Sequence, residues 1–369
     1  MDSAQKPPVS GGQNPDSLSQ IAKLEALIAA NKLPDDLSLT VKAMVARLKI
    51  VHDQPSFYTE YDTVSRYITW VTALPWGRKS EDILDLKHAK EVLDRNHYGL
   101  EVVKEQILEF LSVMILTRQR AGQQGSDIIA RAPILSLVGL AGVGKTTIAY
   151  SIAEALGRKI ERIPFGGLGS AAQLRGKSRL YSDSEPGLVI KALRRAGTSN
   201  PVILLDEIDR VSAEGRSDIM GVLVELLDPL QNKAFTDHFV DFPVDLSQVL
   251  FIATSNNTKD ISTAVVDRLE IIQMPSYTDE EKIVIGKTYV LPKAMHESGL
   301  TPNDFAIADD VWPEAIVRPL GYDPGIRGLQ RVIQGMVRKT VYYMMLGKIP
   351  QGQKFIVTNE NVKHFISAW

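Results

Sequence analysis

The sequence contains no cysteine and no long apolar run, and both absences narrow the functional classes open to it. Without cysteine the chain can form no disulfide, no thiol nucleophile and no cysteine-ligated metal site. No apolar run approaches the roughly 18–20 residues that a membrane-spanning helix needs. The amino-terminal residues have neither the pattern of a secretory signal nor that of an organellar transit peptide. We therefore expect a cytoplasmic protein without a membrane partner.

Charge of one sign is not in excess either. The 42 Lys and Arg residues nearly balance the 44 Asp and Glu residues, which leaves a net charge of −2. Such a total gives no global attraction to nucleic acid or anionic lipid, although local patches can still form. At 369 residues, with 44% hydrophobic residues, the chain is long enough for two or three domains with their own cores.

The first part of the chain reads as a tail followed by helices. Residues 1–16 are rich in Pro, Gly, Ser and Gln, which is typical of a disordered segment. Ser17 is expected to cap the first of three amphipathic helices, and together these helices predict an all-helical module over residues 17–84. A plain helical spacer is the favoured interpretation of this module.

The pattern changes at residue 85, where helices at 85–94 and 100–117 lead to a polar loop near residues 121–126. Buried strands then alternate with periodic helices. The expected strands are Ile134–Val138, Lys159–Phe165, Val202–Leu205, Val249–Thr254 and Ile271–Met274. Because near-continuous apolar strands alternate with helices, we expect an α/β domain over residues 85–276, with a parallel sheet covered by helices on both faces.

After Pro275 the strands are expected to stop. A helical lid domain over residues 277–369 follows, with one more candidate strand at Lys354–Thr358. No internal repeat is evident.

A phosphate-binding motif follows the first of the expected strands. The pattern G-x-x-x-x-G-K-[ST] is matched by Gly139, Leu140, Ala141, Gly142, Val143, Gly144, Lys145 and Thr146. Its glycines allow backbone N–H groups to face phosphate oxygens, and the start of the next helix adds a positive field. Lys145 can reach the β- and γ-phosphates, and the Thr146 hydroxyl can bind Mg²⁺. The motif predicts a site for ATP and Mg²⁺ rather than a Gly-rich turn with an exposed lysine.

A second acidic element completes this prediction. The apolar strand at 202–205 ends on Asp206 and Glu207, and charge at the edge of a core usually serves a metal or a reaction. Asp206 is the expected ligand of Mg²⁺ through water, and Glu207 is the expected general base that polarises the attacking water. A surface ion pair is the alternative interpretation. Together with the phosphate motif, this pair indicates a P-loop ATPase of the AAA+ type.

At this point the sequence resembles one family, the ATPase part of Lon, the ATP-dependent AAA+ protease. The resemblance covers nearly the whole chain from about residue 18. Beyond the phosphate motif it rests on segments 67–76, 97–100, 204–209, 225–232, 251–254, 267–270 and 325–327. It implies a parallel sheet flanked by helices, a carboxy-terminal helical lid and an amino-terminal helical module.

The resemblance also implies roles for residues outside the two motifs. Asn256 looks like sensor 1, Arg268 like an arginine finger acting on a neighbouring subunit's ATP, and Arg327 like sensor 2 in the lid. Without the resemblance, either arginine would read as a solvated surface charge. Tyr98 and Gly99 correspond to residues near the adenine, although a half-buried core tyrosine is an equal alternative.

An arginine finger acting between subunits requires an oligomer, and a closed head-to-tail arrangement is a ring. Six subunits is the usual number in the family, so we expect a homohexamer that acts on protein substrates. Tyr181 is similar to the aromatic residue of the loop that grips threaded polypeptide. Ser182 and Asp183 depart from the aliphatic residue and glycine expected next, and the added carboxylate could favour basic substrates.

The Ser–Lys peptidase domain of Lon would begin where this sequence ends, at Trp369. We expect no peptide-bond cleavage by these residues, so a separate peptidase, a longer protease and a protease-free relative all stay open. A nucleic-acid-associated scaffold or switch is the alternative from another class. It rests on a basic cluster of Arg175, Lys177, Arg179, Lys191, Arg194 and Arg195, for which a solvated or intersubunit face is the favoured interpretation.

Overall fold

The computed structural model describes residues 15–124, 134–320, 323–350 and 352–366. These residues divide into two compact units through which the chain passes more than once. The first unit comprises residues up to 80 together with 168–203 and 213–250. The second comprises 81–167, 204–212 and 251 onward. The domain boundaries predicted at residues 84 and 276 stay a prediction.

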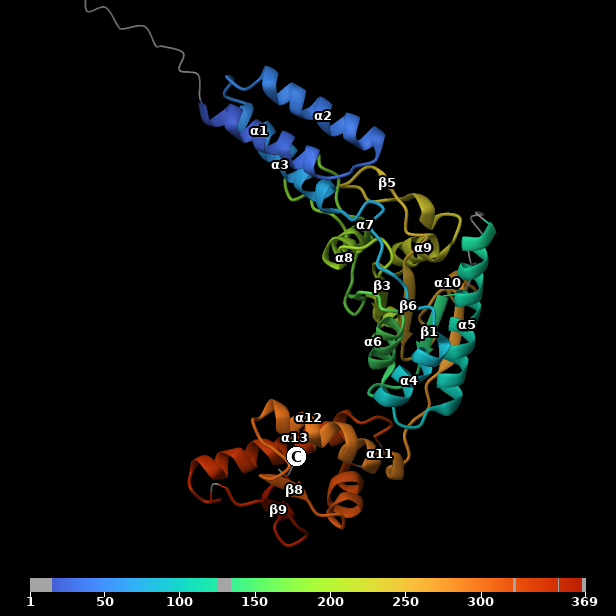
Figure 1. The fold of residues 1–369 in the computed structure, drawn as a ribbon, viewed down its shortest axis with the longest axis vertical. Coiled ribbons are helices and arrows are strands. Elements are labelled where there is room, and N and C mark those ends of the chain that lie inside the picture. The colour runs from blue at the N-terminus through green and yellow to red at the C-terminus, as the bar shows by residue number, and fades with distance from the viewer. Residues whose placement is uncertain (1–14, 125–133, 321–322, 351, 367–369) are drawn as a thin grey trace, which may run out of the picture. The chain divides into compact units, whose positions relative to one another are not determined.

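The first unit is mostly helical. Its helices are α1 (Pro15–Ala30), α2 (Asp35–Ile50), α3 (Phe57–Ala73), α7 (Ala172–Arg175), α8 (Leu188–Ala196) and α9 (Arg216–Leu227), and its short antiparallel strands are β4 (Phe235–Thr236) and β5 (Pro243–Val244). Helices α1, α2 and α3 lie along one another (Figure 1) and bury the apolar positions that face inward. Among these buried residues are Ile21, Leu24, Leu37, Val41, Val45, Leu48, Ile68 and Val71.

The start of α1 differs from the prediction. The helix begins at Pro15, so Ser17 lies inside the first turn and is buried rather than capping the helix. Proline suits this position because its fixed φ is helical and its missing N–H has no partner in the first turn. The part of the predicted tail that covers residues 1–14 lies outside the described residues.

The second unit is built on a five-stranded parallel sheet in the order β2-β3-β6-β1-β7. The strands are β1 (Ile134–Val138), β2 (Ile160–Pro164), β3 (Val202–Asp206), β6 (Leu250–Ser255) and β7 (Leu269–Gln273). Each predicted strand is present, with ends shifted by up to two residues. The α/β fold with a parallel sheet is therefore confirmed. Since β6 lies between β1 and β3, the carboxyl ends of these strands meet at one edge of the sheet.

The helices of this sheet domain are α4 (Leu86–Asn96), α5 (Glu101–Gln124), α6 (Lys145–Ala155) and α10 (Thr263–Val266). The loop predicted near residues 121–126 is wrong as far as Gln124, because α5 continues through it. A single glycine among good helix formers weakens a long helix by only about 1 kcal/mol and does not end it. Residues 125 and 126 lie outside the described residues.

The lid consists of α11 (Asp279–Ile285), α12 (Leu291–Glu297) and α13 (Arg327–Met345) with two short strands, β8 (Phe305–Ile307) and β9 (Phe355–Val357). These elements cluster together (Figure 1) around a core that includes Phe305, Trp312, Leu329 and Met336. Strand β9 matches the last predicted strand. Its parallel partner β8 contradicts the expectation that the lid has no other strand, because three residues are too few to show an alternating pattern.

No helix of the described ranges is long and apolar enough to cross a membrane.

Candidate nucleotide site

A cleft of about 270 Å³ lies in the second unit, where β1, β3 and β6 end. It brings together residues of the phosphate motif, the acidic pair Asp206 and Glu207 at the end of β3, Asn256 and the start of α13. Its lining residues are Ala141, Gly142, Gly144, Lys145, Thr146, Thr147, Arg162, Asp206, Glu207, Asn256, Ile326, Arg327 and Gln330. The motifs that the sequence places about 60 residues apart or more therefore share one cavity.

The phosphate motif forms the turn between β1 and α6. Gly142 and Gly144 have φ of +87° and +95°, which is the left-handed region that favours glycine. Val143 between them is fully buried and anchors the turn in the core. A side chain at Gly139 would clash, because an added Cβ would lie 2.6 Å from the carbonyl oxygen of Met274. The local fold thus requires small residues where a phosphate group would approach the backbone.

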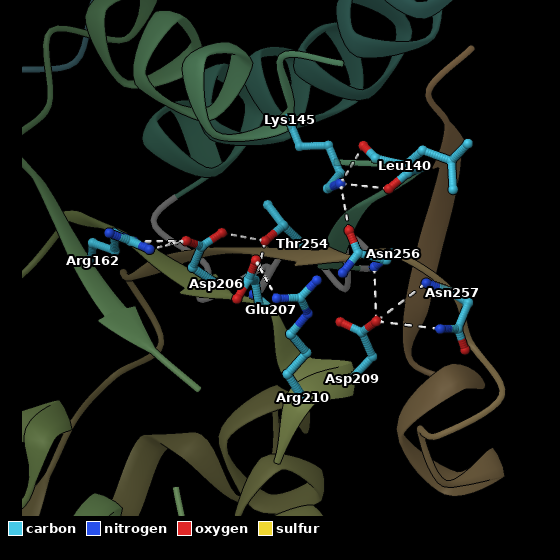
Figure 2. Close-up of polar contacts among 11 residues, drawn as sticks. Leu140, Lys145, Arg162, Asp206, Glu207, Asp209, Arg210, Thr254, Asn256 and Asn257 are labelled. Carbon is cyan, nitrogen blue, oxygen red and sulfur yellow. Dashed lines mark hydrogen bonds and ion pairs between the residues drawn. The ribbon is translucent and has the colours of Figure 1, made fainter. Parts of the chain in front are cut away.

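Lys145 points back across this turn (Figure 2). Its ammonium group donates to the carbonyl oxygens of Gly139 at 2.5 Å and Leu140 at 2.9 Å, and to Oδ1 of Asn256 at 3.2 Å. Burial lowers the pKa of Lys145, the nearby Asp209 carboxylate opposes that change, and Arg327 adds to it. The lysine is therefore held by neutral oxygens at the mouth of the phosphate turn.

Asp206 is a buried carboxylate with a donor on each oxygen. Nε of Arg162 on β2 donates to Oδ2 at 2.7 Å, and Nη2 of the same side chain forms an ion pair with that oxygen at 2.5 Å. The Thr254 hydroxyl on β6 donates to Oδ1 at 2.5 Å. These contacts, visible in Figure 2, fix the direction of the carboxylate before any ligand is considered.

Glu207 has a left-handed backbone with φ of +58°, a conformation that costs a residue of this kind about 1–3 kcal/mol. Its N–H donates to Thr254 Oγ1 at 3.0 Å, which helps to hold the strained turn. Its carboxylate lies 3.6 Å from Arg210 Nη1 and next to Gly166, where an added Cβ would come within 3.3 Å of Oε2. The turn therefore directs the Glu207 side chain to the cleft while Asp206 stays in the strand.

Asp209 orients the segment that carries Asn256. Its Oδ2 accepts the backbone N–H of Asn256 at 3.0 Å and the N–H groups of Asn257 at 3.4 Å (Figure 2). Asn256 is thereby held directly after β6, where its side-chain oxygen accepts a hydrogen bond from Lys145.

The lid contacts the backbone of the phosphate turn. The N–H of Ile326 donates to the carbonyl oxygen of Gly142 at 3.1 Å, and the Tyr277 hydroxyl donates to the carbonyl oxygen of Val143 at 3.2 Å. Gly325 packs so closely that an added Cβ would lie 2.5 Å from the carbonyl carbon of Gly142. Arg327 then begins α13 at the edge of the cleft.

Four predicted residues outside the phosphate motif do not line this cleft. Tyr98 is 41% exposed and, like Gly99, is absent from its lining. Arg268 also lies outside it, between α10 and β7, and donates to the carbonyl oxygen of Ala264 in α10 at 2.8 Å. Tyr181 belongs to the first unit.

The segment around Tyr181 has a fixed base and an exposed tip. Leu180 and Tyr181 are 93% and 64% exposed. Lys177 Nζ lies 2.5 Å from Asp183 Oδ2, and this hydrogen bond and charge lower the pKa of Asp183. At the base, the Gly187 N–H donates to the buried carboxylate of Asp237 at 2.8 Å.

Each residue of the basic cluster predicted from the sequence has an interaction partner within this chain. Arg175, Lys177, Arg179 and Lys191 each form an ion pair with a carboxylate, Arg194 lies 4.1 Å over the ring of Trp70, and Arg195 also has a partner. Charges that are already paired give a weaker field for phosphate groups than the sequence alone indicates.

Sequence reasoning missed three residues of the site: Arg162, Asp209 and Thr254. Asp209 and Thr254 lie within segments that carry the resemblance, but no role was attached to them. Arg162 left a weaker signal. It is one cation in a five-residue strand, and its partner Asp206 lies 44 positions later in the sequence.

Comparisons with known proteins agree with this geometry. The family described as ATPase family associated with various cellular activities (AAA) matches residues 135–277. A Lon protease of Lawsonia intracellularis is 39% identical over 95% of the chain and 40% of its own length. Lon protease 2 of Thermus thermophilus is 42% identical over 86% of the chain and 39% of its own length. A Lon protease of Mycoplasma mycoides is 37% identical over 94% of the chain and 42% of its own length.

The chain is a Lon-like AAA ATPase region. The resemblance stated from the motifs is thus confirmed, and it extends over nearly the whole chain. This Lon-like region spans about 40% of the length of the curated relatives that it matches.

Proposed function

We propose that this region binds ATP with Mg²⁺ in the cleft and hydrolyses it. The observation that carries the proposal is the convergence of the phosphate turn, Lys145, Asp206, Glu207 and Asn256 on one cavity. Oxygen ligands suit Mg²⁺, and the Thr146 hydroxyl and the Asp206 carboxylate both line that cavity. When bound there, Mg²⁺ would neutralise charge on the phosphate oxygens.

Four residues of the cleft would carry the other steps of ATP hydrolysis. Lys145 would exchange its carbonyl partners for phosphate oxygens, and Glu207 would accept a proton from the attacking water. Asn256 would orient that water, and Arg327 would respond to the γ-phosphate from the lid. Because Ile326 and Tyr277 donate to the carbonyl oxygens of Gly142 and Val143, an occupied phosphate turn would change the lid contacts.

We further propose that turnover acts on protein substrates in a cytoplasmic ring, with Arg268 reaching a neighbouring subunit's ATP. Its position outside its own cleft is compatible with that role. Six subunits is the proposed number. Mass measurement with ATP and the Glu207→Gln variant tests this: a ring supports it, and a persistent monomer contradicts it.

The exposed Leu180 and Tyr181 side chains are the proposed contact for unfolded polypeptide. An unfolded protein should stimulate ATP hydrolysis by the wild type, and Tyr181→Ala should lose that stimulation while keeping basal turnover. A wild type that does not respond to unfolded protein would contradict substrate remodelling but not ATP hydrolysis.

A second candidate is the ATPase part of an ATP-dependent protease whose peptidase lies on a further segment or a separate chain. Identity of 37–42% to proteins named Lon protease favours it. Degradation of an unfolded substrate by the complete system, abolished by Glu207→Gln, is the expected result. Degradation that continues in the variant would contradict it.

A further inference from the structure

Arg162 is a cation in direct contact with Asp206, and the proposed function gives it no role. Nε of Arg162 donates to Oδ2 of Asp206, and Nη2 forms an ion pair with the same oxygen. Half of the arginine side chain stays exposed, at 51%, whereas the carboxylate is only 6% exposed. The guanidinium therefore lies between solvent and a buried carboxylate, on the wall of the cleft.

The contact with Arg162 limits how many hydrogen bonds the Asp206 carboxylate can still accept. Each carboxylate oxygen offers about two lone-pair sites. Nε of Arg162 takes one site on Oδ2, and Nη2 lies 2.5 Å from the same oxygen, so the guanidinium covers Oδ2. The Thr254 hydroxyl takes one site on Oδ1 and leaves the other free of these two donors, on a residue that lines the cleft.

We propose that Arg162 is a positioning residue for Asp206 that also limits how tightly the site holds Mg²⁺. By covering Oδ2, it leaves Oδ1 as the oxygen open to a metal-bound water. Its positive charge, in direct contact with the same carboxylate, opposes a second cation nearby. This proposal rests on the proposed ATPase function.

The two effects have opposite signs when the charge is removed. Without the guanidinium, Asp206 attracts Mg²⁺ more strongly but loses its fixed direction. Metal binding should therefore become tighter while turnover becomes slower. A residue that only stabilised the local fold would weaken both.

Two substitutions separate charge from geometry. Arg162→Gln keeps an N–H donor for Oδ2 but removes the charge, and Arg162→Lys keeps the charge but not the paired donors. The first measurement is the Mg²⁺ dependence of binding of a fluorescent ADP derivative to the full chain. The second is steady-state ATP turnover, with thermal unfolding as a check on folding.

For Arg162→Gln we expect half-saturating Mg²⁺ to fall about 3–10-fold and turnover to fall about 10-fold. For Arg162→Lys we expect half-saturating Mg²⁺ within about twofold of the wild type and a turnover that is also reduced. Arg95→Gln is the matched control. Arg95 also pairs with a carboxylate, Glu154 at 2.5 Å, but both side chains are more than half exposed, at 61% and 51%, and neither lines the cleft.

The proposal is overturned if Arg162→Gln needs more Mg²⁺ than the wild type, or if both Arg162 variants behave like Arg95→Gln. Those results would leave the ATPase function intact. A wild type that neither binds nor hydrolyses ATP would overturn the proposed function as well.

Discussion

The hydroxyl of Thr254 accepts the backbone N–H of Glu207 at 3.0 Å. The same hydroxyl donates to Oδ1 of Asp206 at 2.5 Å, so one side chain on β6 ties both acidic residues at the end of β3. Thr254 is fully buried, which means that neither bond can be replaced easily by water. The proposed metal ligand and the proposed general base thus share one structural support.

Thr254→Val should slow ATP turnover by about tenfold and lower the free energy of unfolding by about 1–3 kcal/mol. Valine has nearly the same shape but leaves the Glu207 N–H and an Asp206 oxygen without a partner. Thr254→Ser, which keeps the hydroxyl, is the control and should retain most of the turnover. Steady-state kinetics and urea unfolding measure the two effects; a valine variant with wild-type turnover would contradict the supporting role.

Asp82 contacts two arginines, one of which is buried. Its carboxylate contacts Arg118 and lies 2.7 Å from Nε of Arg158, whose side chain is completely buried. Burial lowers the pKa of Arg158 to about 10, so the guanidinium stays charged at neutral pH. Asp82→Asn should therefore lower the free energy of unfolding by about 3–5 kcal/mol, because it removes the carboxylate charge that faces the buried guanidinium of Arg158.

The control for this measurement is Glu25→Gln, which removes an ion pair to Lys49 whose side chains are about half exposed, at 49% and 50%. That change should stay within about 1 kcal/mol. If the two substitutions lower the free energy of unfolding equally, Asp82 does not stabilise the fold more than an exposed ion pair does.

His97 predicts a specific pH dependence of stability. It is buried, its Nε2 lies 2.8 Å from Ser151 Oγ, and burial, with a smaller contribution from Lys104, lowers its pKa from 6.5 to about 4. Between pH 6.5 and about 4 the unfolded chain binds a proton at this position that the folded chain does not. Stability therefore falls as the pH falls through this window, by up to about 3 kcal/mol from this group.

The measurement is the free energy of unfolding of wild type and His97→Gln at several pH values. Glutamine can still bond Ser151 but cannot titrate, so the difference between the two proteins isolates the histidine. We expect the variant to lose less stability below pH 6.5; identical pH profiles would contradict the buried neutral state.

The Lys177–Asp183 pair bears on substrate preference. Because the lysine offsets the carboxylate next to Tyr181, the wild type should discriminate little between basic and acidic unfolded proteins. Lys177→Gln should raise the stimulation of ATP turnover by basic proteins relative to acidic ones. Adding Asp183→Asn should remove that preference; a preference that survives in the double variant would have another source.

Local patterns predicted much of this fold and site. Gly139–Thr146 and the Asp206–Glu207 pair could be read from contiguous residues, because the turn and the strand end need those residue types at fixed spacing. The roles assigned to these residues stay predictions.

The features that the sequence did not reveal depend on tertiary contacts. Arg162 meets Asp206 only because β2 lies next to β3, and Lys177 neutralises Asp183 only through the folded loop. Strand β8 is stabilised by its pairing with β9, 50 residues later, and not by its own three residues. Such pairings leave no periodic trace in a single sequence.

ATP binding and hydrolysis by the wild type and Glu207→Gln, measured side by side with Mg²⁺, test the proposed ATPase site most directly. We expect both proteins to bind ATP with similar affinity and only the wild type to hydrolyse it. Hydrolysis by Glu207→Gln at the wild-type rate, or no ATP binding by the wild type, would contradict it.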